Sequence, residues 1–269
     1  MTGDFEPLRR RYDVSDLRPH LVANDVVATI VVQVRADLAE TVDLLELASR
    51  TAEVVGVVGW IDLTAADVSG QIDRLRSGVG GEHLVGLRHA VADEADPRWL
   101  LRDDVDAAMR DVAASGLAFD LEITSRELAA ADTLVRRHPD VRFVLDHGAK
   151  PPIAEGWCQR WADGISALAE NPNVWCKLSG LVTEASWSAW STADLQPYVD
   201  HLVAAFPASR MVFGSDWPVC ELAAPYDRVL AAAVETLAAL DGDDHRKILC
   251  DNALNVYRPS RTSLGEMHS

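Results

Sequence analysis

Short apolar runs rich in β-branched residues recur seven times along this 269-residue chain. Each is bounded by polar residues, glycine or proline, which is typical of strands buried on both faces. The predicted strands are Thr29–Val34, Val54–Ile61, Leu84–Arg88, Leu117–Ile123, Val141–Leu145, Val174–Leu178 and Met211–Phe213.

Stretches with helical periodicity alternate with these runs. They are Glu40–Thr51, Asp103–Ser115, Ser125–Arg137, Trp161–Glu170, Leu195–Phe206 and Tyr226–Leu240. This alternation predicts a parallel sheet covered by helices, and the chain length suits a (β/α)8 TIM barrel of roughly 250 residues. An open doubly wound sheet is the alternative. It would usually carry a glycine-rich turn after its first strand, and Gln33-Val-Arg-Ala-Asp37 contains no glycine.

The N-terminal segment complicates the barrel prediction. A closed (β/α)8 barrel needs eight strands, and residues 1–27 contain no convincing strand. Asp13–Asn24 instead has the pattern of a helix with Pro19 inside it. Either the barrel lacks its first strand, or the N-terminal segment closes it irregularly. The expected fold is a distorted barrel over residues 1–257, as one domain, followed by a polar C-terminal tail over residues 258–269.

Charge and composition exclude several classes of partner. With 42 acidic and 25 basic side chains, the formal net charge is −17, which repels nucleic-acid phosphates and anionic lipid surfaces. No apolar run approaches the length of a membrane span. The four cysteines are widely spaced and form no Cys-x-x-Cys pair, so a reducing, cytoplasmic location is expected. The partner expected is therefore a small molecule.

Polar residues stand where the predicted strands end. They are Gln33, Asp62, Arg88 with His89, Asp120 with Glu122, Asp146 with His147, Lys177 with Ser179, and Asp216. Because the carboxyl ends of parallel strands open onto one mouth, these side chains are expected to converge there. Asp216 is the most informative, since it ends an apolar run and is followed at once by Trp217 and Pro218. A helix cap is its alternative role, but the recurrence of such residues favours a catalytic mouth.

The other strand-end residues also have two interpretations each. A histidine beside a carboxylate, as in Asp146-His147, can be a proton shuttle, a metal ligand or a structural group. Lys177 lies within an apolar strand, so its ammonium must enter a polar pocket, a buried ion pair, or both. Arg88, followed by His89, suits a bidentate grip on a substrate carboxylate or carbonyl.

Four motifs occur in a recognisable order: Leu84–His89, Asp146-His147 with Lys150-Pro151, Lys177–Gly180, and Gly214–Pro218. Together they resemble the amidohydrolase-related lactone hydrolases of the amidohydrolase superfamily, a group that includes 2-pyrone-4,6-dicarboxylate lactonase and the fuconolactone and rhamnonolactone hydrolases. The resemblance runs from about Leu8 to Tyr257. It implies a distorted TIM barrel in which Asp216 is the catalytic aspartate of the last strand and His147 the mid-barrel histidine.

One departure from the family pattern concerns metal binding. Family members open with a strand that ends in a His-x-His pair, and this chain has none; His20 is no substitute. His147 and Asp216 would remain as the metal ligands, whereas catalytic zinc normally has at least three protein ligands. The expectation is therefore either no required cofactor or one divalent metal, zinc or manganese.

The leading hypothesis is hydrolysis of a lactone of a small sugar acid or related carboxylate. Asp216 would act as the general base on water, while His147, Arg88 or Lys177 polarises the carbonyl. The expected substrate-binding residues are Arg88, His89, Lys150, Lys177 and Trp217. The alternatives are a metal-dependent amidohydrolase or decarboxylase, and an inactive barrel that binds a sugar acid. An exposed sheet edge would favour a homo-oligomer.

Overall fold

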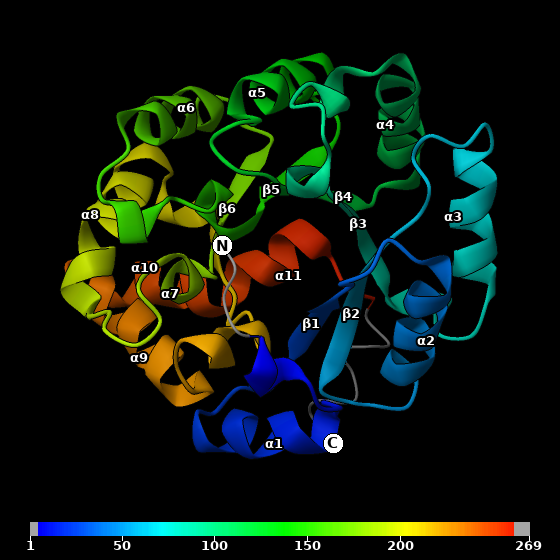
Figure 1. The fold of residues 1–269 in the computed structure, drawn as a ribbon. Coiled ribbons are helices and arrows are strands. Elements are labelled where there is room, and N and C mark those ends of the chain that lie inside the picture. The colour runs from blue at the N-terminus through cyan, green and yellow to red at the C-terminus, as the bar shows by residue number, and fades with distance from the viewer. Residues whose placement is uncertain (1–4, 261–269) are drawn as a thin grey trace.

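A single parallel sheet organises the computed structural model, which describes residues 5–260 (Figure 1). Each strand pairs in parallel with the next one along the chain. The strands are β1 (Thr29–Val32), β2 (Val54–Gly59), β3 (Leu84–Ala90), β4 (Ala118–Glu122), β5 (Arg142–Leu145), β6 (Val174–Leu178) and β7 (Met211–Phe213). All seven predicted strands are confirmed, with small shifts at their ends.

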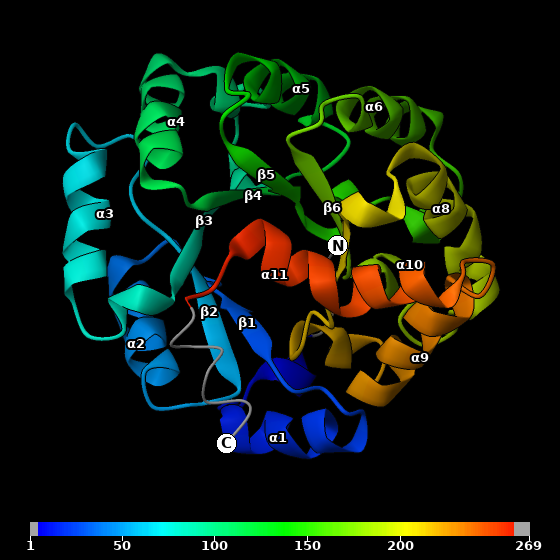
Figure 2. The same cartoon turned by 180° about the vertical axis from the view of Figure 1, so that it is seen from behind.

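Most of the helices surround the outer face of the curled sheet (Figure 1). They are α1 (Val14–Ala23), α2 (Leu38–Ala48), α3 (Val68–Ser77), α4 (Asp103–Ser115), α5 (Leu128–Arg137), α6 (Gln159–Ala169), α7 (Leu181–Glu184), α8 (Thr192–Ala205), α9 (Tyr226–Thr236), α10 (Gly242–Arg246) and α11 (Asn252–Tyr257). Figure 2 shows α11 lying across the opposite end of the barrel from α7 and the N-terminal segment. The helix α11 therefore covers the amino ends of the strands.

Two apolar layers lie on the two faces of the sheet. Inward-facing side chains such as Val58, Val144 and Val212 form one cluster with Val256 and Tyr257 of α11. A larger cluster fills the space between the sheet and the helices around it. Burial on both faces explains why the strands are continuous apolar runs.

The sheet stays open between its first and last strands, because β1 and β7 do not pair within residues 5–260. The helix α1 lies beside β1 at this opening (Figure 1). Asp13 caps it by accepting from the backbone N–H of Ser15, and Asp16 reciprocates on the backbone N–H of Asp13. The expected helix with Pro19 inside it is confirmed, as is the expected distorted barrel; within residues 5–260 no strand precedes β1.

Two elements differ from the sequence interpretation. The sequence pattern does not predict α3, because only Val68, Ile72 and Leu75 give this helix an apolar stripe. The acidic run that begins at Asp241 suggests a solvated turn, but Asp241 caps α10 by accepting from the backbone N–H of Asp244.

Most of the expected polar tail, from residue 261 on, lies outside the described residues. Among residues 5–260, no helix has the length and hydropathy that a membrane span requires.

Candidate active site

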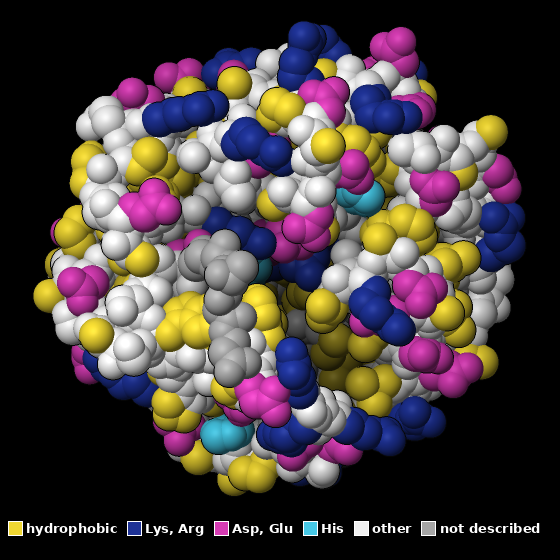
Figure 3. All heavy atoms as spheres, in the orientation of Figure 1, with side chains coloured by type: hydrophobic (Ala, Val, Ile, Leu, Met, Phe, Trp, Pro, Cys, Tyr) yellow, Lys and Arg dark blue, Asp and Glu magenta, His cyan; other side chains and the backbone are white. Residues whose placement is uncertain are grey.

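Ionisable side chains gather where the strands end, on the face that carries α7. Figure 3 shows this face hollowed at its centre, with basic and acidic side chains inside the hollow. The residues that build the mouth are Arg88, Asp120, Glu122, Asp146, His147, Lys150, Lys177, Ser179, Glu184 and Asp216. They come from β3 to β7 and from the loops that follow these strands.

Asp216 and His147 face each other at the centre of this group. The Oδ1 atom of Asp216 lies 3.9 Å from Nε2 of His147, and the two side chains are 18% and 12% exposed. That distance exceeds a hydrogen bond. Nδ1 of His147 lies 2.9 Å from the hydroxyl oxygen of Ser179. Burial raises the pKa of Asp216, although the nearby His147 opposes the shift. A buried carboxyl with a raised pKa is suited to general-base chemistry.

The backbone around these two residues adopts left-handed conformations. The φ angles are +52° at His147, +60° at Ala149, +47° at Lys150 and +56° at Asp216. Side chains other than glycine rarely adopt this region, and such strain persists only where the surrounding structure enforces it. This conformation is concentrated in the segments after β5 and β7, where it sets the direction of the His147 and Asp216 side chains.

Gly180 supports the imidazole from the loop after β6. Its φ is +63°, and a Cβ atom built there would lie 2.6 Å from Nδ1 of His147. A side chain at position 180 would therefore push the ring away from Ser179 or away from Asp216. Only glycine permits this close contact.

We expect Gly180→Ala to lower the hydrolytic rate by about 10²-fold, since a displacement of ~1 Å in a catalytic group can cost that much. Gly116→Ala is the matched control, because Gly116 also has a positive φ, of +70°, but a Cβ atom there would meet nothing within 4 Å. Steady-state kinetics and thermal unfolding of both variants check this. Equal losses of activity in the two variants would show that backbone strain, and not the His147 contact, is responsible.

A buried network of charges forms the floor of the mouth. The ammonium of Lys177 donates to Oδ2 of Asp120 at 2.8 Å and contacts Oδ1 of Asp146. Arg88 donates to the other oxygen of Asp146 at 2.9 Å and to the backbone oxygen of Gln33. Burial alone would raise the pKa of Asp146, but Lys177 and Arg88 together hold it well below its usual range. Burial raises the pKa of Asp120 to about 6, although Lys177 opposes the shift, so Asp146 is the more firmly ionised carboxylate of the two.

A second ion pair lies closer to solvent. Lys150 donates to Oε1 of Glu122 at 2.8 Å, and its side chain is 26% exposed. Burial tends to raise the pKa of Glu122, but Arg88 and Lys150 lower it overall. Burial raises the pKa of Glu184, which also interacts electrostatically with Lys150. The mouth thus contains more carboxylates than cations.

The structure brings together five of the seven residues predicted from the sequence: Arg88, His147, Lys150, Lys177 and Asp216. It does not bring His89 to them. Nε2 of His89 lies 2.8 Å from Glu94, the indole N–H of Trp60 donates to its Nδ1 at 3.1 Å, and Trp99 stacks on its ring. Successive residues of a strand point to opposite faces, so Arg88 faces the barrel interior and His89 the outer helices.

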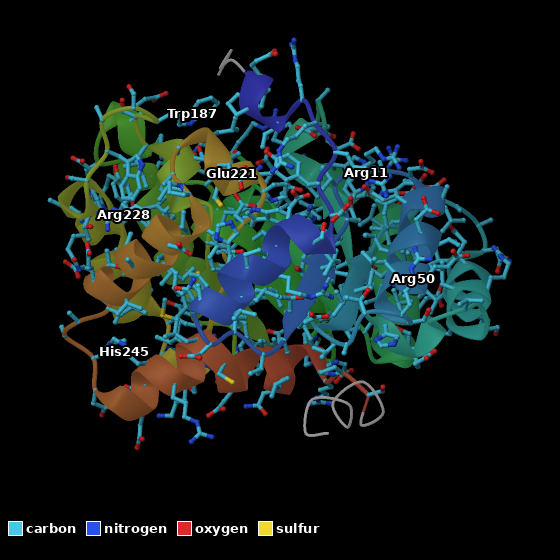
Figure 4. The ribbon with its side chains drawn as sticks, turned by 90° about the horizontal axis from the view of Figure 1, so that it is seen from below. Arg11, Arg50, Trp187, Glu221, Arg228 and His245 are labelled. Carbon is cyan, nitrogen blue, oxygen red and sulfur yellow. The ribbon has the colours of Figure 1, made fainter. Side chains whose placement is uncertain are left out.

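Trp217 belongs to a separate group at the rim. Its indole N–H donates to one carboxylate oxygen of Glu221 at 2.9 Å, and the hydroxyl of Tyr12 donates to the other at 2.9 Å. The Tyr12 ring meets the Trp217 ring edge-on. In Figure 4, Glu221 and Trp187 lie toward the side of the molecule that carries the N-terminal segment, and His245 of α10 lies toward the opposite side. The rim group therefore ties the N-terminal segment to the loop after β7.

Sequence reasoning missed four residues of the mouth and its supports: Tyr12, Glu184, Glu221 and Tyr257. Glu184 follows the β6 motif by four residues, so its position after a strand end was a usable signal. The two tyrosines carry no local signal, because their partners are far away in the sequence.

The donor set for a metal ion is small. Within residues 5–260, no group of three His, Cys, Asp or Glu side chains is arranged to hold a metal. His147 and Asp216 are two suitable ligands, whereas catalytic zinc normally takes at least three from the protein. The described residues therefore do not fit a complete zinc site by themselves.

The sequence profile of the amidohydrolase family matches residues 5–258. The chain belongs to this family. It is 38% identical to an L-fucono-1,5-lactonase of Burkholderia ambifaria, over 98% of this chain and 91% of that protein. It is 41% identical to an L-fucono-1,5-lactonase of Burkholderia multivorans, over 86% of this chain and 80% of that protein. The resemblance inferred from the motifs is confirmed.

A solved structure places this amidohydrolase among barrels of known geometry. An amidohydrolase from Burkholderia multivorans with bound zinc superposes with a TM-score of 0.90 at 34% identity, covering 95% of this chain and 91% of that one. The open seven-stranded sheet described above is thus part of an amidohydrolase barrel.

Proposed function

We propose that this amidohydrolase hydrolyses the lactone of a small sugar acid, with Asp216 as its general base. The observation that carries the proposal is the half-buried Asp216 carboxyl group, held opposite His147 at the barrel mouth with a raised pKa. The names of the two relatives support the substrate class, since both are L-fucono-1,5-lactonases.

In the proposed reaction, Asp216 removes a proton from water as the water oxygen bonds to the lactone carbonyl carbon. His147 and Lys150 donate hydrogen bonds to the oxyanion that develops. When the tetrahedral intermediate collapses, the ring C–O bond breaks and the proton held by Asp216 passes to the departing alkoxide. Lys177 and Arg88 contribute by holding other residues in place and do not bind the substrate. Their donors are largely engaged by Asp120, Asp146 and Gln33.

The charge balance of the mouth favours an uncharged substrate. Three cations, Arg88, Lys150 and Lys177, are each already paired with a carboxylate. Asp216 and Glu184 add two further carboxyl groups to the mouth. A neutral sugar lactone meets no repulsion in the mouth, whereas a dicarboxylate would. Hydrolysis converts the neutral lactone into a carboxylate, which the same field would help to release.

A panel of lactones tests the proposal through the proton released when the acid product ionises. We expect turnover of L-fucono-1,5-lactone or a related sugar lactone, at a rate of about 1–10³ s⁻¹. We also expect at least about 10-fold lower kcat/KM for 2-pyrone-4,6-dicarboxylate, because one unfavourable charge contact of ~1.4 kcal/mol suffices for that factor. Absence of turnover on every neutral lactone would refute the lactonase assignment.

The zinc in the related structure gives a metal-dependent hydrolase specific support as a second candidate. In that case His147 and Asp216 would supply two of the at least three protein ligands that catalytic zinc normally takes, and the ion would provide Lewis-acid chemistry at the mouth. Metal analysis of the purified protein, followed by chelation and addition of zinc or manganese, separates the two routes. Stoichiometric metal and loss of activity on chelation would support the metal-dependent route; unchanged activity after chelation would support the route through Asp216 alone.

A further inference from the structure

The last helix contributes a hydroxyl group to the floor of the mouth. Tyr257, at the end of α11, donates a hydrogen bond of 2.8 Å to Oδ2 of Asp120. The same carboxylate oxygen accepts from the ammonium of Lys177, also at 2.8 Å. The Tyr257 ring centroid lies 5.7 Å from that ammonium. All three residues are buried, with exposures of 3%, 0% and 8% for Tyr257, Asp120 and Lys177.

Asp120 depends on these two donors for its position. Among the described residues, no hydrogen-bond partner reaches its other oxygen, Oδ1. Removal of the Tyr257 hydroxyl would leave Lys177 as the one donor to a fully buried carboxylate. A buried carboxylate with fewer donors costs free energy, and its side chain becomes free to turn.

We propose that Tyr257 is a positioning residue for the active site. Its hydroxyl fixes the carboxylate of Asp120, and Asp120 fixes the ammonium of Lys177. Lys177 then holds Asp146, which directly precedes His147 in the chain and also accepts from Arg88. The geometry links the C-terminal helix to the imidazole opposite Asp216 through contiguous contacts. The catalytic part of this inference rests on the proposed lactonase function.

The helix itself has a separate anchor, which allows the hydroxyl to be tested alone. The side-chain amide of Asn252, at the start of α11, donates to the backbone oxygens of Ala208 and Met211 at 2.7 and 2.8 Å. Val256 packs in the barrel interior with the rest of the inner cluster. Tyr257→Phe keeps both features and the aromatic ring, so we expect α11 to stay in place.

The test compares Tyr257→Phe with Tyr198→Phe. Tyr198 is also 3% exposed, but its hydroxyl has no hydrogen-bond partner within the described residues. We expect Tyr257→Phe to lower kcat about 10-fold with KM nearly unchanged, because the group acts on the chemical step and not on substrate binding. Tyr198→Phe should keep both constants. A normal kcat in a folded Tyr257→Phe protein would overturn the proposal.

A double-mutant cycle with Asp120→Asn identifies the route of the effect. If Tyr257 acts through Asp120, adding Tyr257→Phe to Asp120→Asn should change kcat by less than about 2-fold. If the fold-loss of kcat in the double variant equals the product of the fold-losses in the two single variants, Tyr257 acts independently of Asp120. That result would contradict the proposed route.

A crystal structure of Tyr257→Phe makes the test independent of substrate. We expect the Asp120 carboxylate to turn and the Lys177 ammonium to shift with it, with α11 in place. An unchanged Lys177 would overturn the positioning role whatever the enzyme hydrolyses. Conversely, Lys177 could shift in the variant while the wild-type protein hydrolyses no lactone. That result would uphold the positioning role and refute the lactonase assignment.

Discussion

Asp216→Asn should reduce lactone hydrolysis by about 10²- to 10⁴-fold, the range that a positioned general base contributes. The amide has nearly the same shape as the carboxyl but cannot accept a proton from water. Progress curves with the best lactone of the panel measure the effect. Asp62→Asn is the matched control, because Asp62 also follows a strand end but accepts from Thr64 at 2.7 and 2.9 Å. That control should keep the wild-type rate.

The same substitution should leave the fold at least as stable at neutral pH. Burial raises the pKa of Asp216 in the folded protein, so the folded state binds its proton more tightly than the unfolded state does. Stability contributed by this group is present at low pH and falls as pH rises from the unfolded pKa through the raised folded pKa. The amide of the Asp216→Asn variant cannot ionise and avoids this loss, which urea unfolding at pH 4 and pH 7 would reveal.

The pH dependence of catalysis has the opposite sign. The base must be ionised, so the wild-type rate should rise as pH passes through the raised pKa of Asp216. A folded Asp216→Asn protein that keeps most of the wild-type rate would remove Asp216 from the mechanism and leave His147 as the candidate base.

Local sequence patterns predict the parts of this molecule that depend on local burial. Each strand is apolar because both of its faces are covered. This apolar run can be read from the sequence without knowing which distant residues cover the strand. Asp216 and His147 are predictable for a related reason, because polar groups at strand ends must share one rim in a parallel barrel. Their alignment into a facing pair depends in addition on the left-handed backbone at both residues and on the close contact of Gly180 with the imidazole.

The errors and omissions have a different physical origin. His89 was predicted to bind substrate because it follows Arg88 in the sequence. Successive side chains of a strand point to opposite faces of the sheet, so the two residues do not share a site. Tyr257 meets Asp120 across 137 positions of the sequence, and that contact exists only because α11 covers the barrel end. The α10 helix escapes prediction because its acidic residues give it no apolar face. Contacts between residues far apart in the sequence form only in the folded barrel, and the local sequence pattern therefore does not predict them.

Lys177→Met should have the largest effect on stability, a loss of about 3–5 kcal/mol in the free energy of unfolding. The substitution preserves much of the side-chain volume but leaves Asp120 and Asp146 buried together without the ammonium between them. Lys150→Met is the matched control, because its side chain is 26% exposed and forms its ion pair with the partly exposed Glu122. We expect that variant to lose no more than about 1 kcal/mol.

Acid should partly rescue Lys177→Met. Without the lysine, burial and mutual repulsion raise the pKa of both carboxyl groups, so the variant gains protons on folding and its deficit relative to wild type shrinks as pH falls. Adding Asp120→Asn should likewise recover part of the loss, since Asp146 still pairs with Arg88 and Asp120 is the carboxylate that loses its cationic partner. Urea unfolding at several pH values measures both effects. A deficit that stays constant with pH, and that Asp120→Asn does not reduce, would mean that lost packing and not uncompensated charge destabilises the variant.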